Sequence, residues 1–357
     1  RSTKLGYMQN YNIGVQFQLP QNFVGEVSFI GNKGTNLTSG GLDALNQIPV
    51  DNLRFGEALI QPLSANPGLA PLPYAGFNGT LAQALRRFPQ YQGVGQYLSN
   101  FGLSNYNSLQ FQATRHFTKG LSVLAAYTFS KAMSDVVNQV DGGISAQDVY
   151  NRGLERSLAE FNIPHFLKLT WIAEIPFGKG RRWDLGPVAN AVLGGWNLTG
   201  IHNYRSGDAL RLSMGGFRSD ALFNGTIRPD WIGGADPILN TGRLDVLVPG
   251  SSLQYLNPAA FSAVPLTANG VPTRLGTAPR VLPNVRGPHR FSEDFGIEKR
   301  FPFGENRAVE FRMDAFNLFN RAGLGNPNTD VTSPLFGRIT GPQQGPRNIQ
   351  LSLRVDF

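Results

Sequence analysis

Three alternating charged residues near the C-terminal end of the chain, Glu310, Arg312 and Asp314, form the first group whose types and spacing could do chemistry. Paired carboxylates are the groups that general acid–base catalysis uses. In an extended chain, however, residues two positions apart lie about 6.6 Å apart on one face, and here Arg312 stands between the two acids. The spacing therefore favours a ladder of ion pairs over a catalytic pair.

Other reactive residue types show no pattern typical of catalysis or cofactor binding. The chain has no Cys, and its four histidines lack metal-ligand spacing; they are His116, His165, His202 and His289. The string Gly-Lys-Gly-Arg-Arg at 178–182 resembles a phosphate loop, but no Walker pattern follows, so it is interpreted as a basic turn. No Gly-x-Ser-x-Gly nucleophile elbow occurs. We therefore expect no catalytic residue, no cofactor, no metal site and no enzyme activity.

Period-two alternation of apolar and polar residues is the dominant signal along the chain. In residues 7–19 the odd positions are mostly aromatic or aliphatic, and the even positions are mostly amides. The alternating segments are 7–19, 23–29, 109–114, 121–130, 167–175, 196–205, 291–301, 309–315 and 349–357. They predict about nine strands of roughly 10–14 residues, longer than the usual 5–6 and suited to the 9–11 that a tilted strand needs to cross a bilayer.

Short and long connections alternate between these segments. The short ones are 20–21, 118–119, 176–195 (the longest of the set) and 302–307, and the long ones are 31–104, 131–164, 213–289 and 320–345. An up-and-down meander puts all the long connections at one end, as in outer-membrane barrels with short periplasmic turns and long extracellular loops. The predicted fold class is an all-β, transmembrane, antiparallel up-and-down β-barrel.

Composition agrees with a chain that does not meet water on all sides. Charged residues are only 16%, while aromatic residues are 11% and include 25 Phe. No apolar run approaches the roughly 20 residues of a spanning helix. The net charge of +8 is spread along the chain rather than clustered, so we do not expect a nucleic-acid partner.

Charged residues of the strands fall on the polar phase of the alternation. They are Glu26, Lys168, Glu174, Arg205, Asp294, Glu298, Glu310, Arg312, Asp314, Arg354 and Asp356. Arg or Lys facing lipid at the bilayer midplane costs about 2–4 kcal/mol, so these residues are predicted to face the barrel lumen. They could line a substrate path or contact a plug. For any single residue, structural ion pairing between neighbouring strands is the favoured interpretation.

The chain ends on an alternating segment that closes with an aromatic residue. Its apolar positions are Ile349, Leu351, Leu353, Val355 and Phe357. We expect a last barrel strand that pairs with the first and whose terminal Phe is recognised by the barrel assembly machinery. An ordinary amphipathic surface strand is the alternative.

Short strings along the chain have a familiar order. They are Tyr106–Gln110, Tyr127–Lys131, Ile175–Gly180, Leu193–Gly200, Ser206-Gly207, Asn257–Phe261, Arg286–Pro288, Phe316–Asn320 and Gln350–Phe357. Together they resemble the C-terminal barrel part of TonB-dependent receptors, of the large Oar-like type that carries an N-terminal carboxypeptidase-regulatory-like domain.

The resemblance implies a barrel of about 22 strands around a plug, which imports scarce nutrients with energy passed through TonB. Residues 1–357 would be the C-terminal part of that barrel, in the outer membrane of a Gram-negative bacterium. The implied partners are outer-membrane lipid, the plug and TonB through a preceding part, the barrel assembly machinery, and an unidentified small-molecule or oligomeric nutrient.

Two other functions remain open on the sequence. A passive porin or a surface adhesion barrel could use the same wall, with the loops restricting a pore or binding cells. A soluble exported β-sandwich or propeller that binds glycans would instead bury the apolar phase in a compact interior. The exposure of Phe17, Val123, Leu169 and Leu353 distinguishes this last class from a membrane barrel.

Overall fold

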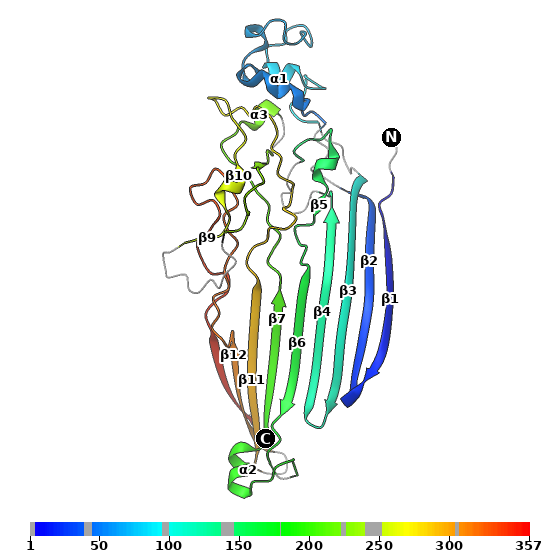
Figure 1. Ribbon diagram of the computed structural model, residues 1–357, viewed down its shortest axis with the longest axis vertical. Helices are drawn as coiled ribbons and strands as arrows, with labels where there is room; N and C mark the ends of the chain where they lie inside the picture. The colour runs from blue at the N-terminus through cyan, green and yellow to red at the C-terminus, as the bar shows by residue number, and fades with distance from the viewer. Residues whose placement is uncertain are drawn as a thin grey trace.

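The nine alternating segments form nine long strands of one antiparallel sheet, in the order of the sequence (Figure 1). The computed structural model describes residues 4–38, 45–94, 100–136, 146–178, 180–222, 226–239, 252–303 and 307–357. The strands are β1 (Tyr7–Leu19), β2 (Phe23–Thr38), β3 (Asn100–Thr118), β4 (Leu121–Ser134), β6 (His165–Glu174), β7 (Trp196–Arg205), β11 (Arg290–Pro302), β12 (Ala308–Phe316) and β14 (Asn348–Asp356). The two-residue β5 (Ser157–Leu158) pairs with β4. The predicted antiparallel meander is confirmed.

The first long connection is shorter than the sequence predicted. We expected it to start at Gly31 and end at Ser104, but β2 continues to Thr38 and pairs with β3 from Asn100, across a bulge after Gly34. The residues of this extension are mainly Gly, Asn, Lys and Thr, so the apolar alternation stops while backbone pairing continues. The segments that were expected to be loop are therefore extensions of β2 and β3 that project beyond the apolar part of the sheet.

Turns and loops separate to opposite ends of the sheet (Figure 1). The short turns include the 3-10 helix η1 (Pro20–Asn22) and the pair Lys119-Gly120, whose φ angles of 51° and 77° suit a two-residue hairpin turn. The same end carries the C-terminus and α2 (Pro187–Leu193), which lies in the connection between β6 and β7. The four long connections all lie at the other end, as predicted.

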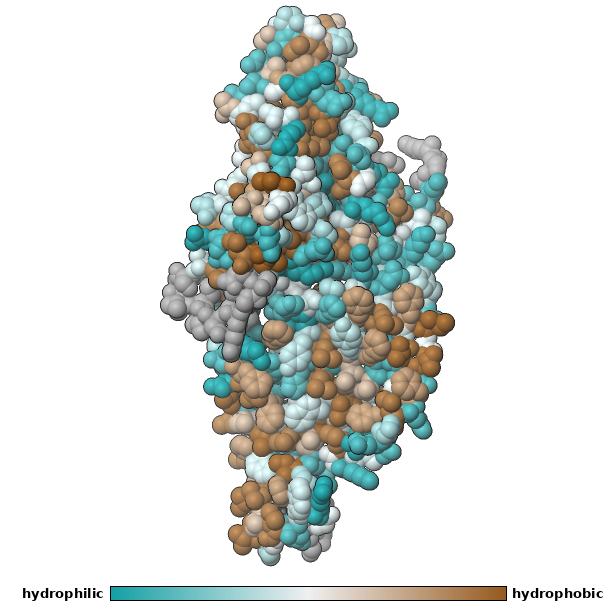
Figure 2. Space-filling view, in the orientation of Figure 1, coloured by the Kyte–Doolittle hydropathy of each residue, from teal (hydrophilic) through white to brown (hydrophobic). Residues whose placement is uncertain are grey.

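Strand register sorts the two phases onto two faces. One transverse row reads Val15, Val27, Phe111, Tyr127, Leu167, Tyr204 and Phe291, and the adjacent row on the other face reads Gln16, Glu26, Gln112, Ala126, Lys168, Asn203 and Ser292. We call these the apolar face and the polar face. Apolar side chains spread over the strands below the long loops (Figure 2).

Within the residues that the structure describes, no protein layer covers the apolar face. Ile13 is 73% exposed and Leu353 70%, and Phe17, Val123 and Leu169 are not buried either. A soluble sandwich or propeller needs these side chains in a compact interior, so that alternative is wrong. Among the residues that the structure describes, no helix is both long and apolar enough to cross a membrane.

Charged residues also occur on the apolar face: Lys33, Arg115 and Lys131 share it, and two more are compensated locally. Glu293, which is 1% exposed, pairs in register with His202 and is 3.1 Å from Nε of Arg321. Lys299 pairs in register with Trp196 and donates to backbone carbonyls of α2. The sequence analysis had placed the strand charges almost wholly on the polar phase, and these five residues are the exceptions.

The hydrophobic core of this chain is in the long loops rather than in the sheet. Large apolar side chains that are fully buried, within the described part, are Ile48, Leu53, Leu59, Leu81, Leu222, Leu256, Leu282 and Ile339, all outside the long strands. One core joins residues 48–82 to residues 214–271, and a second joins residues 210–285 to residues 324–339. Three of the long loops thus pack together, and the second long loop joins them through bonds of Glu155 with Arg228 and Arg280; we call the four loops the outer cap.

Short elements order the outer cap. They are η2 (Val50–Ile60), η3 (Leu63–Ala65), α1 (Leu81–Ala84), η4 (Arg152–Glu155), α3 (Ser219–Leu222), β8 (Asp230–Trp231), β9 (Leu253–Gln254), η5 (Pro258–Ala260), β10 (Phe261–Ser262) and β13 (Arg338–Ile339). The pairing of β9 with β13 links two different loops. Thr80 caps α1 and Asn257 caps η5 through their side chains.

Candidate functional site

All eleven charged residues predicted on the polar phase lie together on the polar face. By strand register, Glu26 and Lys168 lie in one transverse row. A second transverse row contains Glu174, Glu298 and Arg312. Arg205, Asp294, Glu310, Asp314, Arg354 and Asp356 share the same face. Whether this face borders a lumen remains a prediction at this point.

Ion pairs connect many of these charges. Nε of Arg312 lies 2.8 Å from Asp314, and its Nη1 lies 3.9 Å from Glu298. Asp356 accepts from Arg354 at 2.9 Å and lies 3.4 Å from Arg300, a polar-face residue that the sequence analysis had not singled out. Glu174 pairs with Arg181. The arrangement at Arg312 is a ladder of ion pairs, and a guanidinium beside both Glu298 and Asp314 leaves no free carboxylate pair there for acid–base work.

A cavity of about 160 Å³ lies at the outer end of the polar face. Its lining includes Asn203, Arg205, Arg290, Ser292, Gln343 and Gln344. Arg205 and Arg290 both contact Asp208, the former at 3.2 Å, and Nε of Arg290 is buried without a hydrogen-bond partner. Because two guanidinium groups share one carboxylate, the cavity carries excess positive charge and suits an anionic group.

A second cavity, of about 280 Å³, lies between the polar face and the loop before β6. Its lining is Tyr106, Gln110, Thr128, Ser130, Ala132, Phe161, Asn162, Ile163 and Phe166. Aromatic rings beside amides and hydroxyls can stack on a flat polar molecule and also hydrogen-bond to its edge. This site could not be predicted from the sequence, because Phe161 and Asn162 come from a loop without periodic alternation.

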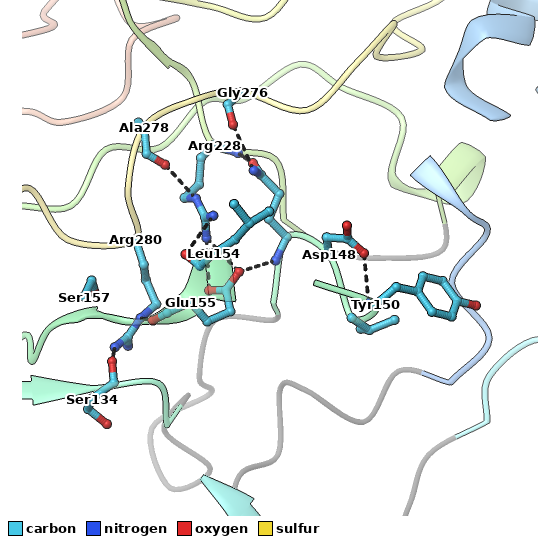
Figure 3. Close-up of polar contacts among 12 residues, drawn as sticks. Ser134, Asp148, Tyr150, Leu154, Glu155, Ser157, Arg228, Gly276, Ala278 and Arg280 are labelled. Atoms are coloured by element: carbon cyan, nitrogen blue, oxygen red, sulfur yellow. Dashed lines mark hydrogen bonds and ion pairs between the residues drawn. The ribbon is translucent and has the colours of Figure 1, made fainter. Parts of the chain in front are cut away.

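A buried polar network joins three of the four loops (Figure 3). Nη1 of Arg228 donates to both oxygens of Glu155, at 2.9 and 3.0 Å, and its Nε donates to the Ala278 carbonyl at 2.9 Å. Arg280 donates to the backbone carbonyls of Glu155, at 3.1 Å, and Ser134, at 2.6 Å. Glu155 is 0% exposed and the Arg228 side chain 6%. The network therefore holds the loop before β6 against the loop before β11.

Close backbone contact completes this network. Gln147 donates from Nε2 to the Gly276 carbonyl at 3.0 Å and from its backbone to Glu155 at 3.0 Å. A Cβ at Gly276 would overlap the carbonyl oxygens of Arg228 and Pro229. Gln47, from the first long loop, donates to the Gln147 carbonyl at 3.0 Å, so the network also reaches that loop.

Carboxylates of the outer cap are held ionised by their partners. Asp230 accepts two bonds from Arg274, at 2.8 and 2.6 Å, and these, with the Thr277 backbone N–H, lower its pKa below the usual 3.8. Burial alone would raise the pKa of Asp208, but hydrogen bonds from Arg290 and Asn326 outweigh it, so that pKa is also lowered.

We expect the outer cap to lose stability in acid because of these pairs. A folded-state pKa below the unfolded value adds stability at higher pH, and this stability disappears as the pH falls through the folded value. Hydrogen exchange of the cap in native outer membranes, between about pH 7 and about pH 3, measures the loss. Asp230→Asn should weaken the cap at neutral pH and make its stability depend less on pH. An unchanged pH profile in that variant would contradict this assignment.

The apolar side chains of the terminal strand lie on the predicted face of the sheet. In β14, Ile349, Leu351, Leu353 and Val355 lie on the apolar face, and Phe357 at the chain end is 92% exposed. β14 pairs with β12, and β1 pairs with β2; for neither strand does the described part of the chain provide a second partner. Recognition of Phe357 by the assembly machinery stays a prediction.

The histidines are spread over the sheet and its ends. His202 accepts from Nε1 of Trp171 at 2.9 Å, and His165 lies 2.7 Å from the Tyr127 hydroxyl. No group of three or more His, Cys, Asp or Glu placed to hold a metal ion occurs in the residues described. In the basic turn at 178–182, Lys179 lies outside the described residues.

The family of the chain is shown by comparison with known protein families. The family model described as the outer membrane beta barrel domain matches residues 1–350. The chain belongs to this family. As an outer-membrane barrel, it turns its apolar face to lipid, its outer cap to the cell exterior and its short turns to the periplasm.

Three solved structures similar to this barrel chain are distant in sequence. The outer membrane transporter YddB from Escherichia coli has 9% identity, with 100% of this chain and 33% of that chain covered and a TM-score of 0.46. The pyoverdine outer membrane receptor FpvA from Pseudomonas aeruginosa has 11% identity, with 99% and 30% covered and a TM-score of 0.43. The ferric preacinetobactin receptor BauA from Acinetobacter baumannii has 12% identity, with 98% and 29% covered and a TM-score of 0.39.

The barrel chain thus spans about a third or less of those proteins. Among curated proteins, none matches it in sequence.

Proposed function

We propose that this outer-membrane chain is the C-terminal part of the barrel of a TonB-dependent receptor that takes up a scarce nutrient. The observation that carries the proposal is the polar face, with its paired charges and two cavities directly beneath a folded outer cap. The strings that resemble Oar-like receptors support the finer assignment, including a preceding plug and a regulatory-like domain. In this role the residues bind and guide a ligand and carry out no reaction.

The sheet edges support a larger barrel. β1 and β14 present unpaired backbone N–H and C=O groups, and in hydrocarbon each such group costs several kcal/mol. We propose that further strands pair with both edges and close the wall, to about 22 strands if the resemblance holds. The polar face would then border the lumen, and its charges would contact the plug or the passing ligand.

Ligand class follows from the cavity chemistry. The cavity at Arg205 and Arg290 suits an anionic group, and the cavity at Tyr106 and Phe161 suits a flat polar group. A nutrient that carries both, such as an anionic chelate or an acidic oligomer, would span the two along the polar face.

Uptake by cells that carry the native gene tests the proposal. We expect growth on one limiting nutrient, among iron chelates and oligosaccharides supplied singly, to require both this gene and TonB. Arg205→Gln with Arg290→Gln should reduce that growth, while Arg307→Gln, at a periplasmic turn, should not. Growth independent of TonB, together with swelling of liposomes that contain the purified protein, would identify a passive porin and overturn the proposal.

A further inference from the structure

The connection between β6 and β7 is unlike the other turns at the periplasmic end. The other turns are short, whereas this one runs from Ile175 to Gly195 and contains α2. Leu185, Val188 and Val192 are all exposed, Val188 by 82%. Their spacing of three and four residues puts them along one side of α2 and its approach. An apolar stripe therefore projects from the lower tip of the molecule (Figure 2).

Two side chains of the apolar face fix the end of α2. Nε1 of Trp196 donates to the Val192 carbonyl at 2.9 Å. Nζ of Lys299 donates to the carbonyls of Ala191, at 2.5 Å, and Val192, at 3.2 Å. The last carbonyls of a helix have no partner within it and carry partial negative charge, so a cation is favourable there. The end of α2 is thereby fixed to the apolar face of β7 and β11, at the periplasmic end of these strands.

Lys299 explains how a charge is tolerated on that face. Its side chain is buried, and its Nζ lies 5.3 Å from the ring centre of Trp196 and 4.7 Å from that of Phe301. The aliphatic stem thus follows the apolar face, and the ammonium reaches the helix end at the membrane boundary. The positive charge of Lys299 is thereby offset by the terminal carbonyls of α2.

Aromatic and basic residues surround the stripe as at a membrane interface. Trp183 is exposed in the same connection, and Phe303 is exposed just beyond the end of β11; the Arg182 guanidinium lies 5.0 Å from the Trp183 ring centre. Trp at the boundary and Arg at headgroup level are typical of barrel girdles and interfacial segments. The stripe is continuous with a face already assigned to lipid, and this continuity selects lipid as its occupant over a protein partner.

We propose that the connection 175–195 is a membrane anchor, which inserts Leu185, Val188 and Val192 into the interfacial region of the periplasmic leaflet. Arg182 lies at the phosphate level of the same leaflet, whereas Arg181 pairs with Glu174 on the polar face. The anchor fixes the depth and tilt of the wall at β6, β7 and β11. This inference depends on the outer-membrane location and not on the proposed transport.

Site-directed fluorescence tests the anchor directly, since the chain has no Cys of its own. Val188→Cys in the native gene product, labelled with bimane and reconstituted in phosphatidylethanolamine–phosphatidylglycerol liposomes, should lose fluorescence with brominated acyl chains and resist iodide. Leu72→Cys, an exposed apolar position in the outer cap, is the matched control and should respond only to iodide. The unmodified protein, treated in the same way, supplies the background.

Each other outcome overturns the anchor. Quenching of the Val188 label by iodide and not by bromolipid would place the stripe in water. Protection from both quenchers would place it against protein, either a second copy or a periplasmic partner. Because Val188 is exposed, its replacement should not disturb folding, and heat-modifiable migration on gels confirms that the barrel is intact.

Discussion

Arg228→Met is expected to destabilise the outer cap by about 3–5 kcal/mol, the usual result of removing one partner of a buried ion pair. The Glu155 carboxylate is fully buried and accepts both bonds from Nη1 of Arg228, so the variant leaves a buried charge without its guanidinium hydrogen bonds. The barrel wall should remain intact. Hydrogen exchange of residues 146–159 and protease cleavage of the cap on whole cells measure the effect.

Two matched variants separate the buried charge from the loss of a long side chain. Arg218→Met breaks an exposed pair with Asp220 and should cost about 1 kcal/mol at most. Glu155→Gln combined with Arg228→Met removes both charges and should recover much of the loss, because no uncompensated ion is left. If the double variant is as unstable as Arg228→Met, packing of the arginine rather than charge pairing holds the cap.

Phe111→Arg is the second large expected effect, a cost of about 2–4 kcal/mol for a charge facing mid-bilayer lipid. Phe111 lies in the apolar row between Val27 and Tyr127, near the middle of the apolar part of β3. The adjacent Gln112 lies on the polar face opposite Glu26, where a new arginine gains an ionic partner. Gln112→Arg should therefore be tolerated.

The amount of heat-modifiable barrel in isolated outer membranes measures this difference. Phe111→Leu controls for the smaller side chain and should behave nearly as the original protein. Equal tolerance of arginine at positions 111 and 112 would contradict the assignment of the apolar face to lipid.

The wall could be predicted from sequence because its signal is local. Alternation in β1 and β7 gave the observed bounds, since every second side chain meets the same environment along the whole strand. Alternation stops where neither face of a strand meets lipid, as in the extension of β2 beyond Gly31. Alternation also could not predict Lys299 and Glu293 on the apolar face, because their partners are a helix end and an arginine from distant parts of the chain.

The outer cap could not be predicted for a different physical reason. Its loops are rich in Gly and Pro and have no periodic pattern, and their stability comes from contacts between segments far apart in sequence. Glu155 and Arg228 are 73 residues apart, and each alone looks like a solvent-exposed loop charge. The same holds for Asp208, whose role follows only from the meeting of the cavity residues Arg205 and Arg290.

The interlocked cap means that the surface seen from outside the cell is discontinuous in sequence. Ile48, Leu222 and Val271 share one core, so a synthetic peptide that copies a single loop lacks the neighbours that shape it. Antibodies raised against such peptides will recognise extended chain and bind intact cells poorly. Grafting one loop into a related barrel will likewise fail to transfer its shape, and the loops have to be moved as a set.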